Sequence, residues 1–175
     1  QRGVLNLFHS DAQRHAATRR GNAMRLSGID AELLDRDGVR DYCPLLDLDN
    51  GRFPIMGGLL QPRGGSARHD AVAWGFAKAA SDRGVDILEN CEVTGIDVEN
   101  GAVAGVSTTR GKIRAKKIGI AVAGHTSQVA AMAGLTLPIE SHLLQAWVSE
   151  GLKPMIGGVV TFGAGHFYIS QSDKG

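Results

Sequence analysis

This 175-residue chain has few cysteines, no long apolar run and no excess of either charge. Its two cysteines, Cys43 and Cys91, provide neither a disulfide framework nor the ligand spacing of a metal site. Lys and Arg number 19 against 18 Asp and Glu, and a net charge of +1 disfavours nucleic acid as the main partner. The longest nearly apolar run, 118–124, is far shorter than the ~18 residues that read as a membrane span. We therefore expect a cytoplasmic protein that binds neither nucleic acid nor membrane.

Several catalytic signatures are also missing. The sequence contains no Gly-x-Ser-x-Gly, no Cys-x-x-Cys and no Gly-x-Gly-x-x-Gly, since Gly163-Ala164-Gly165 is followed by Tyr168 where a third glycine is required. Its six histidines are too scattered for a local metal site. These absences disfavour a serine hydrolase and a metalloenzyme. The chain opens on a strand-like run at Gln1 and stops after another at Gly175, which predicts a piece of a longer protein.

Glycine is the residue in excess, with 24 of the 175 positions, and it separates short apolar runs instead of forming a linker. We therefore expect tight turns and close backbone contacts. A strand over 4–8 precedes a helix over 11–26, because Ser10 and Gln13 have the spacing of a capping box. The apolar face of this helix is thin and predicts a place at the surface; its members are Ala12, Ala16, Ala23 and Met24.

Three shorter elements complete the first third. The residues over 29–34 are expected to be extended, and Asp35 can cap a brief helix that runs through Tyr42 and ends before Pro44. The glycine-rich segment over 54–62 is expected to be irregular.

The middle of the chain predicts a helix followed by short strands. Apolar residues recur at three- and four-residue spacing over 71–80, and Gly84 stands where a left-handed C-terminal cap is expected. A strand over 85–88 comes next. Glycine-containing turns then separate the strands of a three-stranded meander over 92–98, 102–108 and 112–113.

The last part mixes two kinds of sheet. An apolar strand over 118–123, buried on both faces, is expected to break at Gly124 into a capped helix over 126–134. The segments over 139–150 and 159–170 alternate like long strands of another sheet. The fold class is therefore α/β, in the form of an α+β mixture in which parallel-sheet units are interleaved with antiparallel strands.

Two segments could carry chemistry. Arg68 and His69 stand where a glycine-rich loop enters a helix, and a helix N-terminus beside a fixed positive charge would stabilise an anionic cofactor ring. The alternative is that His69 and Asp70 only cap the helix. Gly124 lies in a strand-to-helix turn whose backbone could approach a pyrophosphate, with a plain turn as the alternative.

Five stretches of the chain carry a resemblance to known proteins. They are QRGVLNL (1–7), QPRGG (61–65), ARHDAVAW (67–74), NCEVTG (90–95) and ISQSDKG (169–175). Together they resemble the D-amino-acid oxidase-like family of FAD-dependent oxidoreductases, and within it the beta subunits of heterotetrameric sarcosine oxidases. The resemblance implies the central fragment of such a fold. It assigns 1–65 and 137–175 to the antiparallel substrate domain and 66–136 to the FAD-binding domain.

The resemblance also implies two cofactors, a noncovalent FAD and a covalent FMN. The attachment histidine of the family motif falls on His69 and its basic neighbour on Arg68, while a second FMN-facing histidine falls on His166. The FAD contacts fall on Val93 and Gly124. An imidazole is a good nucleophile toward an oxidised flavin, and a guanidinium can stabilise the reduced ring. No catalytic residue is assigned, because the groups that would hold a substrate carboxylate are expected outside this chain.

The implied activity is oxidative demethylation of sarcosine to glycine, with electrons passing from FAD to FMN to oxygen, in a subunit of a hetero-oligomer. The isolated fragment is expected to be inactive. One alternative is another FAD-dependent oxidase or dehydrogenase acting on dimethylglycine, glycine or proline. Another is a non-catalytic interaction module derived from a flavoprotein. The substrate class in the first two cases is a small secondary amine or amino acid.

Overall fold

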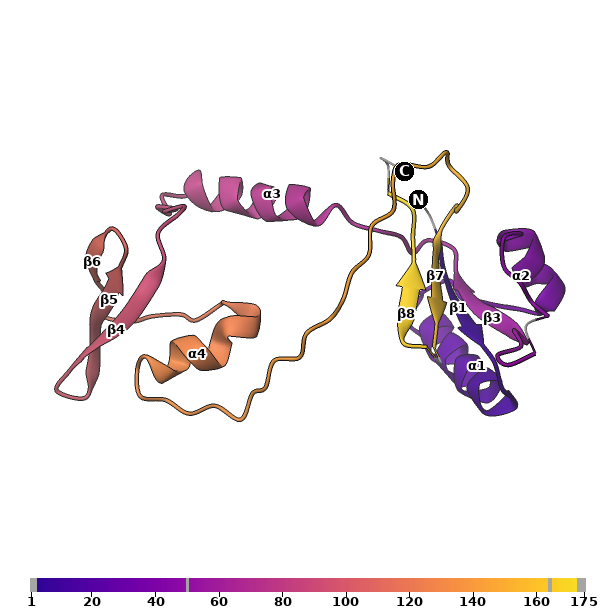
Figure 1. Ribbon diagram of the computed structural model, residues 1–175, viewed down its shortest axis with the longest axis horizontal. Helices are drawn as coiled ribbons and strands as arrows, with labels where there is room; N and C mark the ends of the chain where they lie inside the picture. Colours follow the sequence, from indigo (N-terminus) through magenta and orange to yellow (C-terminus); the bar gives the residue numbers. More distant parts are fainter. Residues whose placement is uncertain (1–2, 50, 164, 173–175) are drawn as a thin grey trace. The chain divides into compact units, whose positions relative to one another are not determined.

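The computed structural model describes residues 3–49, 51–163 and 165–172, which form two compact units (Figure 1). The first unit comprises Gln1–Val72 and Val148–Gly175, and the second comprises Ala73–Trp147. Within the described ranges, no helix has both the length and the apolar composition needed to cross a membrane.

A five-stranded sheet forms the first unit, with the strand order β2-β3-β1-β7-β8. The central strand β1 pairs antiparallel with β3 and parallel with β7, so residues from both ends of the described chain build one sheet. β2 and β8 complete the two edges by antiparallel pairing. The strand bounds are Val4–Phe8 for β1, Glu32–Leu34 for β2, Gly57–Gln61 for β3, Val159–Phe162 for β7 and Phe167–Ile169 for β8.

The two helices of this unit begin where their capping residues predict. In α1 (Asp11–Leu26), the Ser10 hydroxyl accepts a hydrogen bond from the Gln13 backbone N–H at 3.3 Å. The Gln13 side chain in turn accepts from the backbone N–H of His9, one residue beyond the usual partner in a capping box, at 2.7 Å. α2 (Arg36–Tyr42) begins at Asp35, whose carboxylate accepts from the Gly38 backbone N–H at 2.9 Å. Both predicted helices are confirmed.

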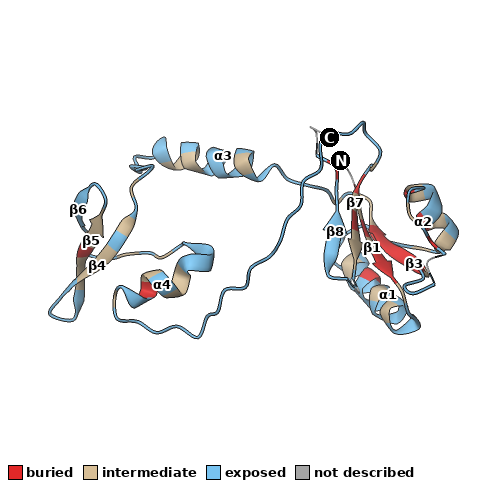
Figure 2. Ribbon diagram, in the orientation of Figure 1, coloured by how far each residue is buried: buried red, intermediate tan, exposed pale blue. Residues whose placement is uncertain are grey.

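The core lies on one face of the sheet, against α2. Buried side chains of β1, β3 and β7 meet there with Val39 of α2, and Figure 2 shows the buried residues concentrated on these strands. The cluster consists of Leu5, Leu7, Val39, Cys43, Leu48, Ile55, Leu60 and Val160. These eight buried side chains stabilise the sheet that positions the rest of this unit. Burial of each Val, Leu or Ile side chain contributes about 1.5–3 kcal/mol to the free energy of folding.

Helix α1 lies at the surface, as its thin apolar face predicts, and contacts the sheet mainly around Gly21. Ala12, Ala16 and Ala23 are exposed, and the only buried residue of the helix is Gly21. A Cβ atom on Gly21 would lie 3.0 Å from Leu59 Cδ1 of β3. The predicted face did not include Gly21, because close approach of the helix to β3 depends on a residue with no side chain.

The segment predicted to be irregular over 54–62 contains β3, and that prediction was wrong. Gly57 has a φ of +151°, and a Cβ atom there would lie 2.6 Å from Phe8 Cζ and collide with the backbone oxygen of Leu34. The strand needs glycine at this position to fit between β1 and β2. Pro54, Pro62 and the pair Gly57-Gly58 are typical of irregular segments, so the sequence did not indicate this strand, whose residues Gly57–Leu60 are buried.

The second unit contains a helix, a meander and a short helix. α3 (His69–Ser81) begins in the first unit and continues into the second, confirming the predicted helix. The meander is an antiparallel sheet of β4 (Val93–Glu99), β5 (Ala102–Thr108) and β6 (Gly111–Arg114). Asn100 and Gly101 have φ values of 49° and 77°, as a type I′ hairpin turn requires. The predicted meander is confirmed. η1 (Ala123–His125) and α4 (Thr126–Ala131) follow.

Three predicted strands are absent from the described residues: 85–88, 118–123 and 139–150. The run over 118–123 is also not buried on both faces, since its residues are half-buried or exposed. A strand is held by hydrogen bonds to a neighbouring strand, and no described strand pairs with these three segments. Leu143 is fully exposed, and Leu144, Trp147 and Val148 are nearly so.

Two further predictions were partly wrong. The single long strand over 159–170 is a hairpin of β7 and β8. α4 ends at Ala131, not at Gly134, and no side chain caps it. The hydroxyl of Thr126 donates to the Ala123 oxygen at 2.6 Å, and that of Ser127 donates to the Ile139 oxygen at 2.7 Å. Both hydroxyls are therefore committed elsewhere.

Gln171 fastens a loop to the end of β8. Its side-chain oxygen accepts from the backbone N–H groups of Met155 and Ile156 at 2.8 and 3.1 Å. Its side-chain nitrogen donates to the backbone oxygens of Leu152 and Lys153 at 3.1 and 2.8 Å. Gln171 is the one buried polar residue among the described residues, and both its side-chain oxygen and its side-chain nitrogen have hydrogen-bond partners.

Replacing Gly57 with alanine should lower the free energy of unfolding by about 3 kcal/mol, because the strained φ and the collision with Leu34 and Phe8 both oppose the change. Gly51→Ala is the matched control, since nothing lies within 4 Å of the added methyl group and its φ is not positive. Denaturant unfolding of both variants measures the difference. Equal midpoints would contradict the close packing of β3.

Gln171→Glu should destabilise the protein by about 2–4 kcal/mol. A carboxylate cannot donate to the oxygens of Leu152 and Lys153, and it brings a charge into a buried position. Gln145→Glu, at an exposed position, makes the same chemical change without that burial. The melting temperature in thermal unfolding should differ clearly between the two variants. An unchanged melting temperature for Gln171→Glu would show that the clamp, meaning the four hydrogen bonds of the Gln171 side chain, does not stabilise the protein.

Candidate functional site

The loop that leads to α3 is fastened to the central sheet at its start. The Gly64 backbone N–H donates to the Gln61 oxygen at 3.1 Å, and the Gly64 oxygen accepts from the Gly3 N–H at 2.6 Å. A Cβ atom on Gly64 would lie 2.8 Å from a methyl group of Val4. The residues just before β1 and those just after β3 are thus held together, and the chain proceeds from there to Arg68 and His69.

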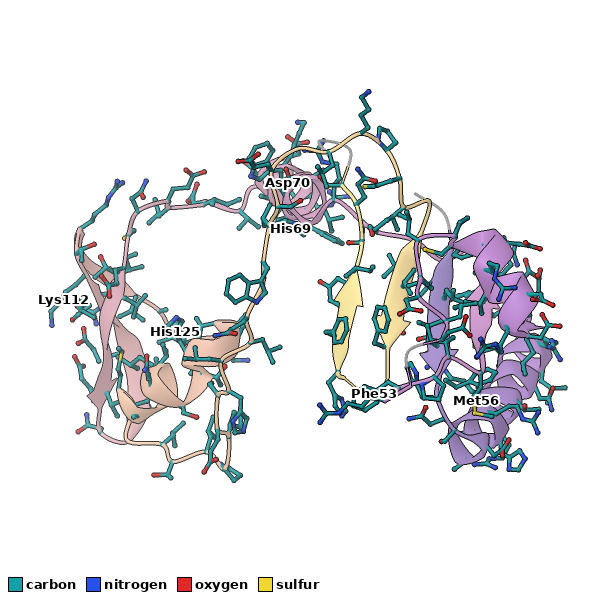
Figure 3. All side chains as sticks on the ribbon, turned by 45° about the vertical axis from the view of Figure 1, so that its right-hand side comes forward. Phe53, Met56, His69, Asp70, Lys112 and His125 are labelled. Atoms are coloured by element: carbon teal, nitrogen blue, oxygen red, sulfur yellow. The ribbon has the colours of Figure 1, made fainter. Side chains whose placement is uncertain are left out.

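His69 and Asp70 are the first two residues of α3 (Figure 3), and Arg68 precedes the helix. The Arg68 guanidinium donates to the Asp70 carboxylate at 3.2 Å, and that carboxylate also accepts from the Ala71 N–H at 2.8 Å. The hydrogen bond from Arg68, the bond from Ala71 and the neighbouring His69 hold the pKa of the Asp70 carboxyl below its usual range. Asp70 is therefore ionised at neutral pH and supports the helix start.

The His69 imidazole is exposed and has no hydrogen-bond partner among the described residues. Of the two residues suggested as caps, Asp70 binds a backbone N–H of the first turn and His69 does not. An exposed imidazole beside a guanidinium has the chemistry that attachment of a flavin needs, a nucleophile with a cation that favours an anionic ring. The residues present fit such a group.

Val93 opens β4 beside an irregularity in the meander. It pairs with Thr108, and the register shifts between Val93 and Gly95, so that Thr94 is an extra residue in the ladder. Thr94 turns its hydroxyl to the Ser107 oxygen at 3.2 Å. Bulges of this kind often redirect backbone groups next to binding sites. Val93 is half-buried and directly precedes this bulge, which therefore influences the direction of its backbone groups.

Gly124 lies in the 3-10 turn before α4, and its surroundings are open. A Cβ atom there would meet only the Ser141 hydroxyl, at 3.8 Å, and that hydroxyl donates to the Gly124 oxygen at 2.7 Å. The left-handed backbone of this turn falls on Ala123, with a φ of 45°. The conformation of this turn does not itself require glycine at 124, and contact of its backbone with a pyrophosphate stays a prediction.

His166 lies in the turn that joins β7 to β8. Its φ is 52°, a left-handed conformation that few residues other than glycine adopt, and its side chain is exposed. Phe162 and Phe167 stack at a centroid distance of 4.5 Å at the base of this turn. The stacked rings hold the hairpin from which His166 projects.

Arg68 and His69 are consecutive at the start of α3 and belong with His166 to the first unit, whereas Val93 and Gly124 belong to the second unit. The roles of all five residues stay predictions. In the described ranges, no three His, Cys, Asp or Glu side chains gather as a metal site would require. Nothing in the sequence indicated the buried role of Gln171, which is the second of two polar residues after the apolar strand β8.

Comparison with known proteins gives consistent relatives. A profile of the FAD dependent oxidoreductase family matches residues 1–175. The chain is 73% identical over 175 residues to a protein named sarcosine oxidase subunit beta from Rhizobium meliloti, and 48% identical over 176 residues to one of the same name from Arthrobacter. It covers 42% and 44% of those proteins. A D-amino acid dehydrogenase from Cereibacter sphaeroides is 34% identical over 139 residues, which are 79% of this chain and 31% of that protein.

Solved structures share the fold. The L-proline dehydrogenase of P. horikoshii matches 100% of this chain and 47% of its own, with a TM-score of 0.78 and 23% identity. Glycine oxidase from Bacillus cereus matches 74% of this chain and 34% of its own, with a TM-score of 0.58 and 25% identity. The predicted mixed α/β architecture is confirmed. Because the family profile covers all 175 residues, the chain belongs to the FAD-dependent oxidoreductase family of the D-amino-acid oxidase type.

Proposed function

We propose that this chain is the central part of a subunit that oxidises sarcosine, or a closely related secondary amine, in a flavin-dependent reaction. One observation carries the proposal: the 73% identity to a sarcosine oxidase beta subunit extends over the whole chain. Identity to the D-amino acid dehydrogenase is less than half as high and covers only 79% of the chain. The chain spans about two fifths of the length of the sarcosine oxidase subunits that it matches.

The proposed reaction converts sarcosine, water and oxygen into glycine, formaldehyde and hydrogen peroxide. When bound, the flavins supply the electron acceptor for the two electrons and the hydrogen that leave the N-methyl carbon, and oxygen finally takes up the electrons. Within this chain, the backbone around Val93 and Gly124 would contact FAD. Under the same proposal, 66–136 belong to an FAD-binding domain and 1–65 and 137–175 to a substrate domain.

FMN would be held through His69, with Arg68 beside it and His166 as a further contact. Three features support this assignment: the His69 imidazole is exposed, it lacks a hydrogen-bond partner among the described residues, and a guanidinium precedes it. His69 would supply the imidazole nitrogen for a bond to the flavin 8α-methyl carbon, one proton would leave each of the two groups, and the bound flavin would supply the acceptor for the electron pair. A positively charged Arg68 favours the ring that has gained that negative charge.

The name "subunit beta" carried by the relatives implies a multi-subunit assembly with a small-molecule substrate. We propose that this chain assembles with other subunits in the cytoplasm, with FMN near an interface between subunits.

Sarcosine should reduce the flavin of the assembled holoenzyme at least tenfold faster than N,N-dimethylglycine, glycine or proline. Anaerobic stopped-flow mixing, followed by the loss of visible flavin absorbance, measures each rate. Faster reduction by proline, glycine or dimethylglycine would favour the alternative oxidases and dehydrogenases of this family. Absence of reduction by all four in flavin-loaded protein would favour a non-catalytic interaction module.

His69→Asn should abolish covalent FMN while leaving noncovalent FAD bound, because asparagine is of similar polarity but lacks the attacking nitrogen. The matched control is His15→Asn, which changes an exposed histidine on α1. Acid-precipitated protein is tested for flavin fluorescence, and mass spectrometry locates added mass on the peptide that contains His69. Covalent flavin on the His69→Asn variant would contradict the assignment.

A further inference from the structure

Helix α1 and the central sheet line an open pocket of about 330 Å³ in the first unit. Four residues of the helix line one side, and strands β1, β3 and β7 line the other. The apolar part of the wall includes Phe8, Ala17 and Leu59. A pocket of this volume is at the lower end of the range for small-molecule sites and suits a ligand of few atoms.

Two polar side chains on the sheet face the pocket. The Thr161 hydroxyl donates to the Asn6 side-chain oxygen at 3.0 Å, across the parallel pairing of β1 and β7. Asn6 in turn directs its side-chain nitrogen toward the Leu59 oxygen at 3.5 Å, a long contact. The acceptor of Asn6 is therefore used, while its amide group retains an N–H that can donate.

The helix side of the pocket contributes stronger donors. Gln13 uses its side-chain oxygen to accept from the His9 backbone N–H at 2.7 Å, which leaves its amide N–H groups toward other partners. Arg20 is exposed, and it has no hydrogen bond or ion pair with any described residue. No Asp or Glu lines the pocket. The polar capacity left in this pocket thus consists mainly of N–H donors, one of which carries a full positive charge.

We propose that this pocket binds a small carboxylate with a short apolar body. The carboxylate would pair with the Arg20 guanidinium and accept a further hydrogen bond from Gln13, since a guanidinium presents two parallel N–H donors to two carboxylate oxygens. The apolar body would lie against Phe8, Ala17 and Leu59. A single cation above an apolar wall suits a monoanion of this kind better than a phosphate, which carries more charge and no apolar part. This inference does not depend on the proposed sarcosine oxidation.

The test uses the assembled holoenzyme and 4,4-azipentanoate, a five-carbon carboxylate whose diazirine labels neighbouring side chains on irradiation. Peptide mapping by mass spectrometry should find the label on the segment of α1 that contains Ala16 and Ala17, or on β3 near Leu59. The neutral amide of the same compound should label these peptides about tenfold less, because it lacks the charge that pairs with Arg20.

Two substitutions test the pocket itself. Arg20→Gln should reduce labelling about tenfold, whereas Arg19→Gln, the neighbouring arginine outside the pocket lining, should leave it unchanged. Ala17→Leu should block the pocket with its larger side chain, and its control is Ala23→Leu at an exposed position of the same helix. Equal labelling by the acid and the amide, or full labelling of the Arg20→Gln protein, would overturn the proposal.

Discussion

The parallel pairing of β1 with β7 is the interaction on which the first unit depends. It joins Asn6 to Thr161 across 155 residues, and the second unit lies within that interval of the sequence. Closing a loop of this length costs about 4 kcal/mol beyond its constant part. Burial of Leu5 and Val160, both fully inaccessible on the paired strands, contributes about 3–6 kcal/mol. The sheet is thus a long-range structure that forms when distant parts of the chain meet.

The same sheet holds the start of the loop that leads to the proposed flavin-attachment residues Arg68 and His69. Backbone hydrogen bonding between Gly3 and Gly64 ties the start of the loop to β1, and no side chain of Arg68 or His69 is needed for that attachment. The helix start is supported by Asp70, which takes its hydrogen bonds from Arg68 and Ala71. The His69 imidazole therefore makes no hydrogen bond that supports the fold among the described residues, and its ring nitrogens can bind a ligand.

Fold and substrate are separate questions in this family. The structure resembles a proline dehydrogenase and a glycine oxidase, yet these share at most 25% of their residues with the chain. One architecture carries different chemistry when the residues around the cofactor change. The sarcosine proposal therefore depends on the 73% identity to a named subunit, and its direct test is the rate at which each amine reduces the flavin.

Elements that depend on local contacts could be predicted from the sequence. Ser10 and Asp35 begin helices because their side chains bind N–H groups three residues away, and the Asn100-Gly101 turn follows from the left-handed backbone these residues tolerate. The sequence also indicated the position of the Arg68-His69 pair at a helix start.

Elements whose partners are distant in the sequence could be identified only in the folded chain. Strand β3 forms because it pairs with β1 on one side and β2 on the other. The apolar segments over 118–123 and 139–150 are not strands, because no described strand pairs with them. The carboxylate pocket and the clamp of Gln171 each combine residues from separate elements. A sequence pattern reports the conformational preferences of neighbours, whereas strands, clamps and pockets require partners that only the folded chain supplies.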